Sequence, residues 1–144
     1  MGLKDYQSHC KKNQKIIICQ DKKNPQKYVA HNEERNDVYQ YLFDGDVVKE
    51  GKRCDYLLLN DTKKRIYFVE LKGSDLNYAL VQIEESVKVC KTRFSDEING
   101  CSISFRVILN KVRSPNLYTN DVKKFKKRVG SDLVYKTLMY EEKI

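Results

Sequence analysis

Two apolar runs separated by a short polar segment constrain the fold of this chain more than any other feature. Residues 54–59 and 65–71 are rich in β-forming side chains, and residues 60–64 between them are polar and turn-prone. This pattern predicts an antiparallel β-hairpin. Because apolar side chains occur on both faces of both strands, we expect the hairpin to lie inside a sheet that is covered on both sides.

The register of this hairpin determines which polar side chains meet. A four-residue loop at 61–64 would place Asp55 directly opposite Glu70. Directly opposed side chains have Cβ atoms about 4.5–5.5 Å apart. Lys72 follows Glu70 by two residues and therefore shares its face of the strand. The spacing predicts two carboxylates and one ammonium group in a cluster at the sheet end away from the turn.

Such a cluster suits a hard divalent cation. Two close carboxylates repel each other, and burial increases the repulsion. Mg²⁺ prefers one or two carboxylates, keeps several waters and binds phosphate oxygens. Lys72 would orient a metal-bound water or stabilise charge that develops on the phosphate. The three residues Asp55, Glu70 and Lys72 therefore predict metal-dependent chemistry on a phosphate group.

The remaining pattern alternates strands and helices. Apolar side chains repeat at three- and four-residue steps from Leu76 to Cys90, which predicts an amphipathic helix with Ser74 or Asp75 as N-cap. A short basic helix is expected at 121–129, ending at Gly130. Further strands are expected at 15–20, 37–43, 102–109 and 132–140. This order predicts one α/β domain over residues 1–144, a sandwich with a mixed sheet.

Asp55, followed by Glu70-Leu71-Lys72 at the end of the next strand and then by a helix, resembles the PD-(D/E)XK nuclease superfamily over roughly residues 44–91. The resemblance implies a restriction-endonuclease-like three-layer sandwich in which helices flank a mixed central sheet. It implies Asp55, Glu70 and the backbone carbonyl of Leu71 as ligands of Mg²⁺ or Mn²⁺, with Lys72 as the catalytic lysine. Cys54 departs from the family, which has proline at this position; we expect Cys54 to be a small core residue.

The sequence leaves alternatives open for the further residues of the expected metal site. Gln82 resembles the helix glutamine of some branches of the superfamily, and a surface position is the alternative. A third acidic residue is expected, and its identity is open among Glu33, Glu34, Asp44 and Asp46. The segment Asp44-Gly45-Asp46 is also typical of a simple turn.

Charge is distributed unevenly along the chain. Residues 1–28 carry a net charge of +5, residues 29–110 of −2 and residues 111–128 of +6. Basic surfaces around an acidic centre suit a polyanion held near a metal. The residues expected to contact phosphate are Lys123, Lys124, Lys126, Lys127 and Arg128. The alternative for this segment is a solvated amphipathic helix without a ligand.

Composition narrows the classes of protein. The chain has only two histidines. This small number argues against zinc hydrolases and histidine-based triads, which need more nitrogen ligands or a partnered base. The five cysteines include no Cys-x-x-Cys pair, and no signal peptide or membrane span is evident, so we expect a reduced cytoplasmic protein without membrane attachment.

Two functional hypotheses follow from these patterns. The first is a metal-dependent endonuclease, acting on DNA rather than RNA and related to restriction or phage defence. Cutting a duplex would require a homodimer or a partner subunit. The alternative is an inactive nuclease fold that serves as a nucleic-acid-binding or protein-interaction module.

Overall fold

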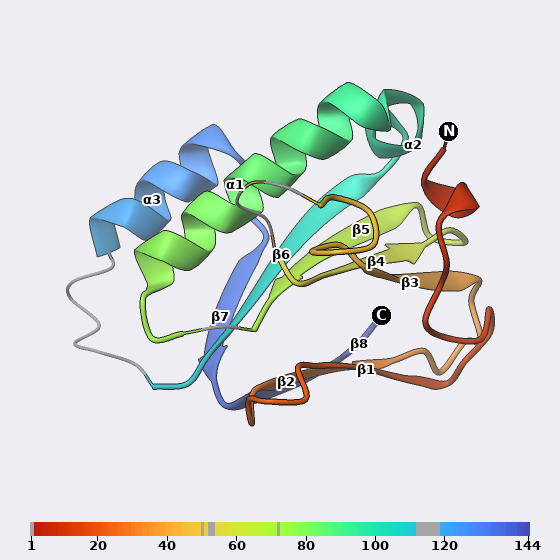
Figure 1. Ribbon diagram of the computed structural model, residues 1–144, viewed down its shortest axis with the longest axis horizontal. Coiled ribbons are helices and arrows are strands. Elements are labelled where there is room, and N and C mark those ends of the chain that lie inside the picture. Colours follow the sequence, from red (N-terminus) through yellow and green to blue (C-terminus); the bar gives the residue numbers. More distant parts are fainter. Residues whose placement is uncertain (1, 50, 52–53, 72, 112–118) are drawn as a thin grey trace.

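A computed structural model describes residues 2–49, 51, 54–71, 73–111 and 119–144 of the chain. Its strands form a five-stranded and a three-stranded sheet (Figure 1). A short 3₁₀ helix, Leu3–Asp5, precedes the first strand. The larger sheet has the order β3-β4-β5-β6-β7. Its strands are β3 (Val38–Leu42), β4 (Tyr56–Asn60), β5 (Arg65–Glu70), β6 (Ser102–Leu109) and β7 (Leu133–Thr137).

The α-helices all cover one face of the five-stranded sheet (Figure 1). Strands β3, β4 and β5 are antiparallel neighbours, whereas β6 is parallel to β5 and β7 is parallel to β6. Helix α1 (Leu76–Arg93) and the short α2 (Ser95–Asn99) follow β5, and α3 (Thr119–Arg128) precedes β7. Parallel crossovers share one hand, which places both connecting helices on the same face. None of the described helices is long and apolar enough to span a membrane.

The face beneath the helices carries the larger core. Leu57 of β4 and Phe68 of β5 pack here with Ile83 of α1. Phe105 of β6 meets Phe125 of α3 edge to face, with ring centroids 5.0 Å apart. Burial of these large side chains ties both helices to the sheet, and each contributes about 1.5–3 kcal/mol of hydrophobic free energy.

The end of α3 depends on close packing. The sequence predicted this helix over residues 121–129, and the structure has it at Thr119–Arg128, followed by the expected Gly130. A β-carbon at Gly130 would lie 2.6 Å from Cε2 of Phe105. Any larger residue would therefore push the end of α3 away from the sheet.

A three-stranded sheet covers the other face. Its order is β1-β2-β8, with β1 antiparallel and β8 parallel to the central β2. The strands are β1 (Ile16–Gln20), β2 (Lys27–His31) and β8 (Met139–Lys143). Ile17 and Tyr28 pack here with Leu58 and Tyr67 of the larger sheet. The hairpin β4–β5 is thus covered on both sides, as its apolar faces predicted.

These layers confirm part of the expected architecture and correct another part. The α/β class and the mixed sheet are confirmed. The expectation that helices flank the sheet on both faces is wrong: over the described ranges, the second face carries the three-stranded sheet and no helix (Figure 1). Side chains of β1 alternate between exposed and buried, which is typical of a strand with one face on a core.

The expected last strand, 132–140, is also corrected, because it divides at Leu138. This residue has a φ of 67°, which ends β7 and redirects the chain into the other sheet. Its N–H donates to the carbonyl of Leu109 at 2.8 Å, and its carbonyl accepts from the N–H of Lys27 at 3.0 Å. Leu138 is therefore the joint between the two sheets.

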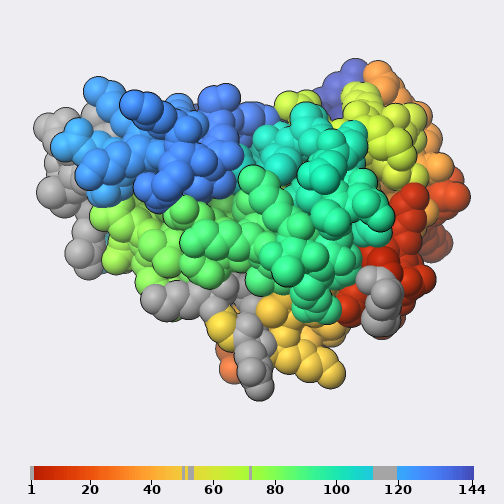
Figure 2. Space-filling model, turned by 90° about the horizontal axis from the view of Figure 1, so that it is seen from above, coloured from red at the N-terminus to blue at the C-terminus, as the bar shows by residue number. Residues whose placement is uncertain are grey.

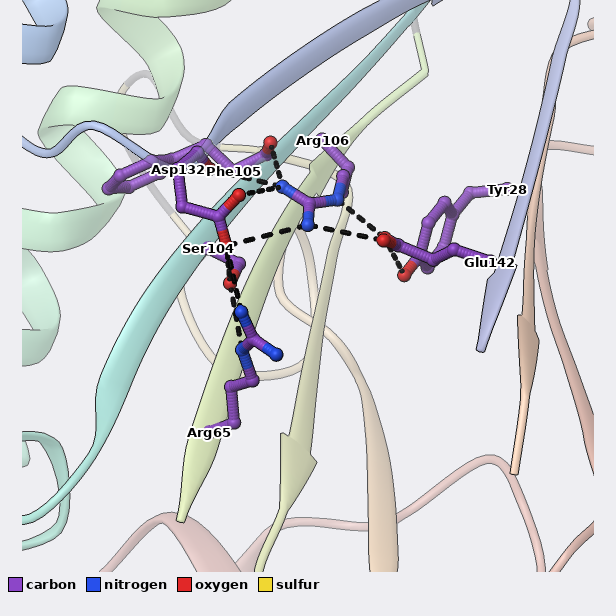
Figure 3. Close-up of polar contacts among 7 residues, drawn as sticks. All are labelled: Tyr28, Arg65, Ser104, Phe105, Arg106, Asp132 and Glu142. Carbon is purple, nitrogen blue, oxygen red and sulfur yellow. Dashed lines mark hydrogen bonds and ion pairs between the residues drawn. The ribbon is translucent and has the colours of Figure 1, made fainter. Parts of the chain in front are cut away.

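A buried arginine also connects the two sheets (Figure 3). Arg106 on β6 is 4% exposed. Its guanidinium donates to Glu142 of β8 (Nη2 to Oε1, 3.2 Å) and to Asp132 beside β7 (Nη1 to Oδ1, 3.1 Å). Tyr28 of β2 donates its hydroxyl to Oε2 of Glu142 at 2.6 Å. One cation is therefore held between carboxylates that come from opposite sides of the interface.

Asp132 is the most heavily bonded carboxylate of this network. It also accepts from Ser104 and from Nη2 of Arg65, the latter at 3.1 Å. Burial raises the pKa of Asp132, but the hydrogen bonds from Ser104 and Arg106 and the charges of Arg106 and Arg65 outweigh burial. The pKa of Asp132 therefore lies below its usual value, and its charged form is stabilised by folding.

This shift predicts a specific loss of stability in acid. A carboxylate with a depressed folded-state pKa stabilises the protein above the unfolded pKa, near 4, and that stabilisation is lost as the pH falls through the folded value. We expect the free energy of unfolding to fall between about pH 5 and pH 3, and to fall less in Asp132→Asn. Urea unfolding, followed by circular dichroism across this pH range, gives the free energy of unfolding of the wild type and of Asp132→Asn. Parallel pH profiles would contradict the assignment.

Candidate functional site

The hairpin β4–β5 has the register that the sequence predicted. Asn60 pairs with Arg65, and Tyr56 pairs with Val69. The side-chain oxygen of Asn60 accepts from the N–H of Lys63 at 3.1 Å, which stabilises the four-residue turn. Extension of this register by one residue sets Asp55 opposite Glu70, at the sheet end away from the turn.

Both carboxylates converge on one backbone amide. The N–H of Leu71 donates to Oδ2 of Asp55 at 2.9 Å and to Oε1 of Glu70 at 3.1 Å. The two carboxylates therefore lie close together and share one hydrogen-bond donor. Asp55 is 7% exposed and Glu70 is 1% exposed, so both are withdrawn from bulk water.

Helix α1 is bound to the strand at this point. The hydroxyl of Ser86 accepts from the N–H of Cys54 at 2.7 Å and donates to the carbonyl of Gln82 at 2.8 Å. Asp75 accepts from the N–H of Tyr78 at 3.2 Å and is the N-cap of the helix. The bond between Cys54 and Ser86 fixes one side of α1 next to the residue before Asp55.

Cys54 and Gln82 occupy different environments near these bonds. Cys54 is fully buried in the helix-side core, as expected. Burial raises the pKa of its thiol well above the usual value, and the charges of Glu70 and Asp55 add to this effect. Gln82 is half-buried, one helical turn before Ser86. The structure thus places Gln82 on the side of α1 that faces the start of β4, and its functional role stays a prediction.

The other acidic candidates are separated by the fold. Asp44 is half-buried and lines the same pocket as Asp55, in a turn where Gly45 has a φ of 118°. Asp46 instead pairs with His9 at 2.8 Å. Glu34 pairs at 3.3 Å with Lys63, which lies in the hairpin turn at the opposite end of the strands. Asp44 is therefore brought to Asp55, whereas Glu34 is not.

Glu33 is likewise engaged elsewhere. It pairs with Lys143 of β8 at 3.5 Å. Lys72, the expected catalytic lysine, lies outside the described residues.

Over the ranges that the structure describes, no group of three or more His, Cys, Asp or Glu side chains is close enough to hold a metal. The carboxylates of Asp55 and Glu70 nevertheless offer hard oxygen donors, which suit Mg²⁺. This ion takes its remaining ligands from water, backbone carbonyls and substrate.

A pocket of about 410 Å³ adjoins Asp55. One side is formed by Asp44, Asp55 and Tyr56 of the larger sheet. The other side is the turn between β1 and β2, which contributes Lys22 and Lys23. Sequence reasoning counted these lysines only within the basic segment 1–28 and did not place them at the site, because it did not identify β2 and so did not predict the turn as part of a hairpin.

The basic helix has a mixed role. Figure 2 looks onto the helix layer and shows α3 beside α1. Arg128 of α3 forms a bidentate pair with Glu84 of α1, with both N–O distances 2.8 Å, and its hydrogen bond lowers the pKa of Glu84. Arg128 therefore packs one helix against the other. The lysines of this helix, Lys123, Lys124, Lys126 and Lys127, are exposed. Their contact with phosphate stays a prediction.

The site thus combines two buried carboxylates at one backbone amide with a pocket that is bordered by lysines. Its interpretation depends on this chain's own residues. Comparisons with protein-family models, with curated proteins and with solved structures found no match.

Proposed function

We propose that this protein is a divalent-metal-dependent nuclease that hydrolyses phosphodiester bonds, with DNA as its substrate. The observation that carries the proposal is the convergence of Asp55 and Glu70 on the amide of Leu71, beside an open pocket. A structural carboxylate pair would have no need of adjoining space for a ligand. The resemblance to the PD-(D/E)XK superfamily agrees with this chemistry, and restriction or phage defence is the setting that it implies.

The residues have distinct roles in this proposal. Asp55 and Glu70 would hold Mg²⁺ or Mn²⁺ through carboxylate oxygens, with the carbonyl of Leu71 as a further ligand. An ion held there would supply polarisation of the phosphoryl group and a lower pKa for a bound water. Lys72 orients the attacking water and stabilises charge on the phosphate. The water oxygen bonds to phosphorus as one P–O ester bond breaks, which leaves a phosphomonoester and a hydroxyl end.

Cleavage of both strands of a duplex sets a further requirement. The described part of one chain offers one such pair of carboxylates, and each strand needs its own attack. We therefore propose that duplex cleavage uses a homodimer or a partner subunit.

The test is a substrate panel. Plasmid DNA, single-stranded DNA and RNA are incubated with Mn²⁺, with Mg²⁺ or with EDTA, and the products are separated on gels. We expect cleavage of DNA with metal, none in EDTA, and a rate in Asp55→Asn that is lower by about 100-fold or more. Asp96→Asn, which changes an exposed aspartate of α2, is the matched control and should retain the wild-type rate.

Three outcomes would change the conclusion. Cleavage that persists in EDTA or in Asp55→Asn would contradict the metal site. Cleavage of RNA alone would change the substrate class. Binding of DNA without cleavage under any of these conditions would favour the non-cleaving module, which the exposed lysines of α3 would also serve.

A further inference from the structure

The turn between β1 and β2 lines the same pocket as Asp44 and Asp55. Its residues Lys22 and Lys23 are exposed, as is Pro25, and both lysines line the pocket. The turn therefore adds two positive charges to the pocket beside Asp55. Among the side chains that the structure describes, none of α3 lines this pocket.

Several hydrogen bonds hold this turn in place. The side chain of Asp21 accepts from the N–H of Lys23 at 3.1 Å and from the amide of Asn24 at 3.4 Å. Tyr56, the residue after Asp55, donates its hydroxyl to the carbonyl of Gln20 at 3.0 Å. The turn is thus connected directly to the strand that carries Asp55, so its lysines have a fixed base beside the site.

The two lysines also differ from many others in their electrostatic environment. Among the residues that the structure describes, neither Lys22 nor Lys23 has a carboxylate at ion-pair distance. Elsewhere, Lys12 pairs with Asp37 and Lys63 pairs with Glu34. The charges of Lys22 and Lys23 are therefore not compensated by ion pairs within the described fold, although Asp21, Asp44 and Asp55 line the same pocket.

We infer that Lys22 and Lys23 bind the phosphates that flank the scissile one, so that the β1–β2 turn holds the nucleic-acid strand across the metal site. This inference rests on the proposed function. Lysine is a compact point charge that binds phosphate without a fixed geometry, which suits a sequence-independent contact with the backbone. The turn, rather than α3, is then the main phosphate contact near the reacting bond.

The test measures binding without cleavage. A fluorescein-labelled DNA duplex is titrated with the full chain in Ca²⁺ at several KCl concentrations, and fluorescence anisotropy gives the Kd. We expect the Lys22→Gln/Lys23→Gln double variant to weaken binding about tenfold. The slope of log K against log salt should become shallower by about 2, because two phosphate contacts are lost. The Lys22→Arg/Lys23→Arg variant, which keeps both charges, should bind the duplex with the wild-type Kd.

Matched controls separate this contact from general charge. Lys11→Gln/Lys12→Gln removes the same charge from adjacent exposed lysines at the other end of β1 and should change the Kd and the slope little. Lys126→Gln/Lys127→Gln tests the rival surface on α3. An unchanged Kd and slope in the turn variant, with a loss in the α3 variant, would overturn the inference.

The outcomes also distinguish the inference from the proposed function. Cleavage by the wild type with an unaffected turn variant would leave the nuclease and remove the role of the turn. Turn-dependent binding without cleavage would support the inference and contradict the nuclease. Absence of both binding and cleavage in the wild type would overturn both.

Discussion

Replacement of Arg106 by methionine lowers the free energy of unfolding by about 3–5 kcal/mol, the range expected when one partner of a buried ion pair is removed. The substitution leaves Glu142 with only 17% of its side chain exposed and without its cation. Asp132 loses three hydrogen bonds from the same guanidinium. Methionine keeps much of the volume of the arginine side chain. The loss of free energy of unfolding is therefore caused by the missing charge and hydrogen bonds rather than by a cavity. Urea unfolding at neutral pH gives the difference.

Arg65→Met is the matched control, because Arg65 contacts the same Asp132 from a position that is 41% exposed. A pair with this exposure contributes about 0–1 kcal/mol. The double variant Arg106→Met/Glu142→Gln should recover part of the loss, since it removes the uncompensated carboxylate together with the cation. If Arg106→Met and Arg65→Met were equally stable, the network would not hold the two sheets together.

The second large effect is expected at Glu70. Glu70→Gln keeps the shape of the side chain and removes the charge of one proposed metal ligand. A bound metal contributes several kcal/mol to transition-state stabilisation, and each 1.36 kcal/mol is tenfold in rate, so we expect single-turnover cleavage to slow by about 100- to 1000-fold. Calorimetric titration with Mn²⁺ should show a parallel loss of affinity, which separates a ligand from a residue that only orients substrate.

Glu34→Gln makes the same chemical change between β2 and β3, where Glu34 pairs with Lys63 of the hairpin turn, and should keep the wild-type rate and Mn²⁺ affinity. Circular dichroism of both variants establishes that each is folded. Wild-type cleavage and Mn²⁺ binding in folded Glu70→Gln would remove Glu70 from the site. A loss in Glu34→Gln as large as that in Glu70→Gln would show that the effect comes from general negative charge and not from the position of Glu70.

The hairpin and its register were predictable because their determinants are local. The turn at 61–64 and the apolar alternation on either side of it lie within one short segment, and the pairing of Asn60 with Arg65 follows from loop length alone. The opposition of Asp55 and Glu70 needed no further information. The N-cap Asp75 and helix α1 are equally local features.

The second sheet was not predictable in this way. Strand β2 pairs with β8, and 114 residues separate Tyr28 from Glu142 in the sequence. No local pattern indicates such a partner. The Arg106 network and the position of the pocket lysines depend on this distant pairing. The sequence therefore predicted the carboxylates of the site but not the β1–β2 turn that lines the same pocket.

The pairing of β2 with β8 has a consequence for how the molecule assembles. During synthesis the β1–β2 hairpin emerges long before its partner, and contacts of such high sequence separation form late because closing the intervening loop is entropically costly. An early folding intermediate would then hold Asp55 and Glu70 in their hairpin while the lysine turn is still undocked. In the proposed nuclease, the lysine turn would then join the carboxylates only after β8 has been synthesised and has paired with β2.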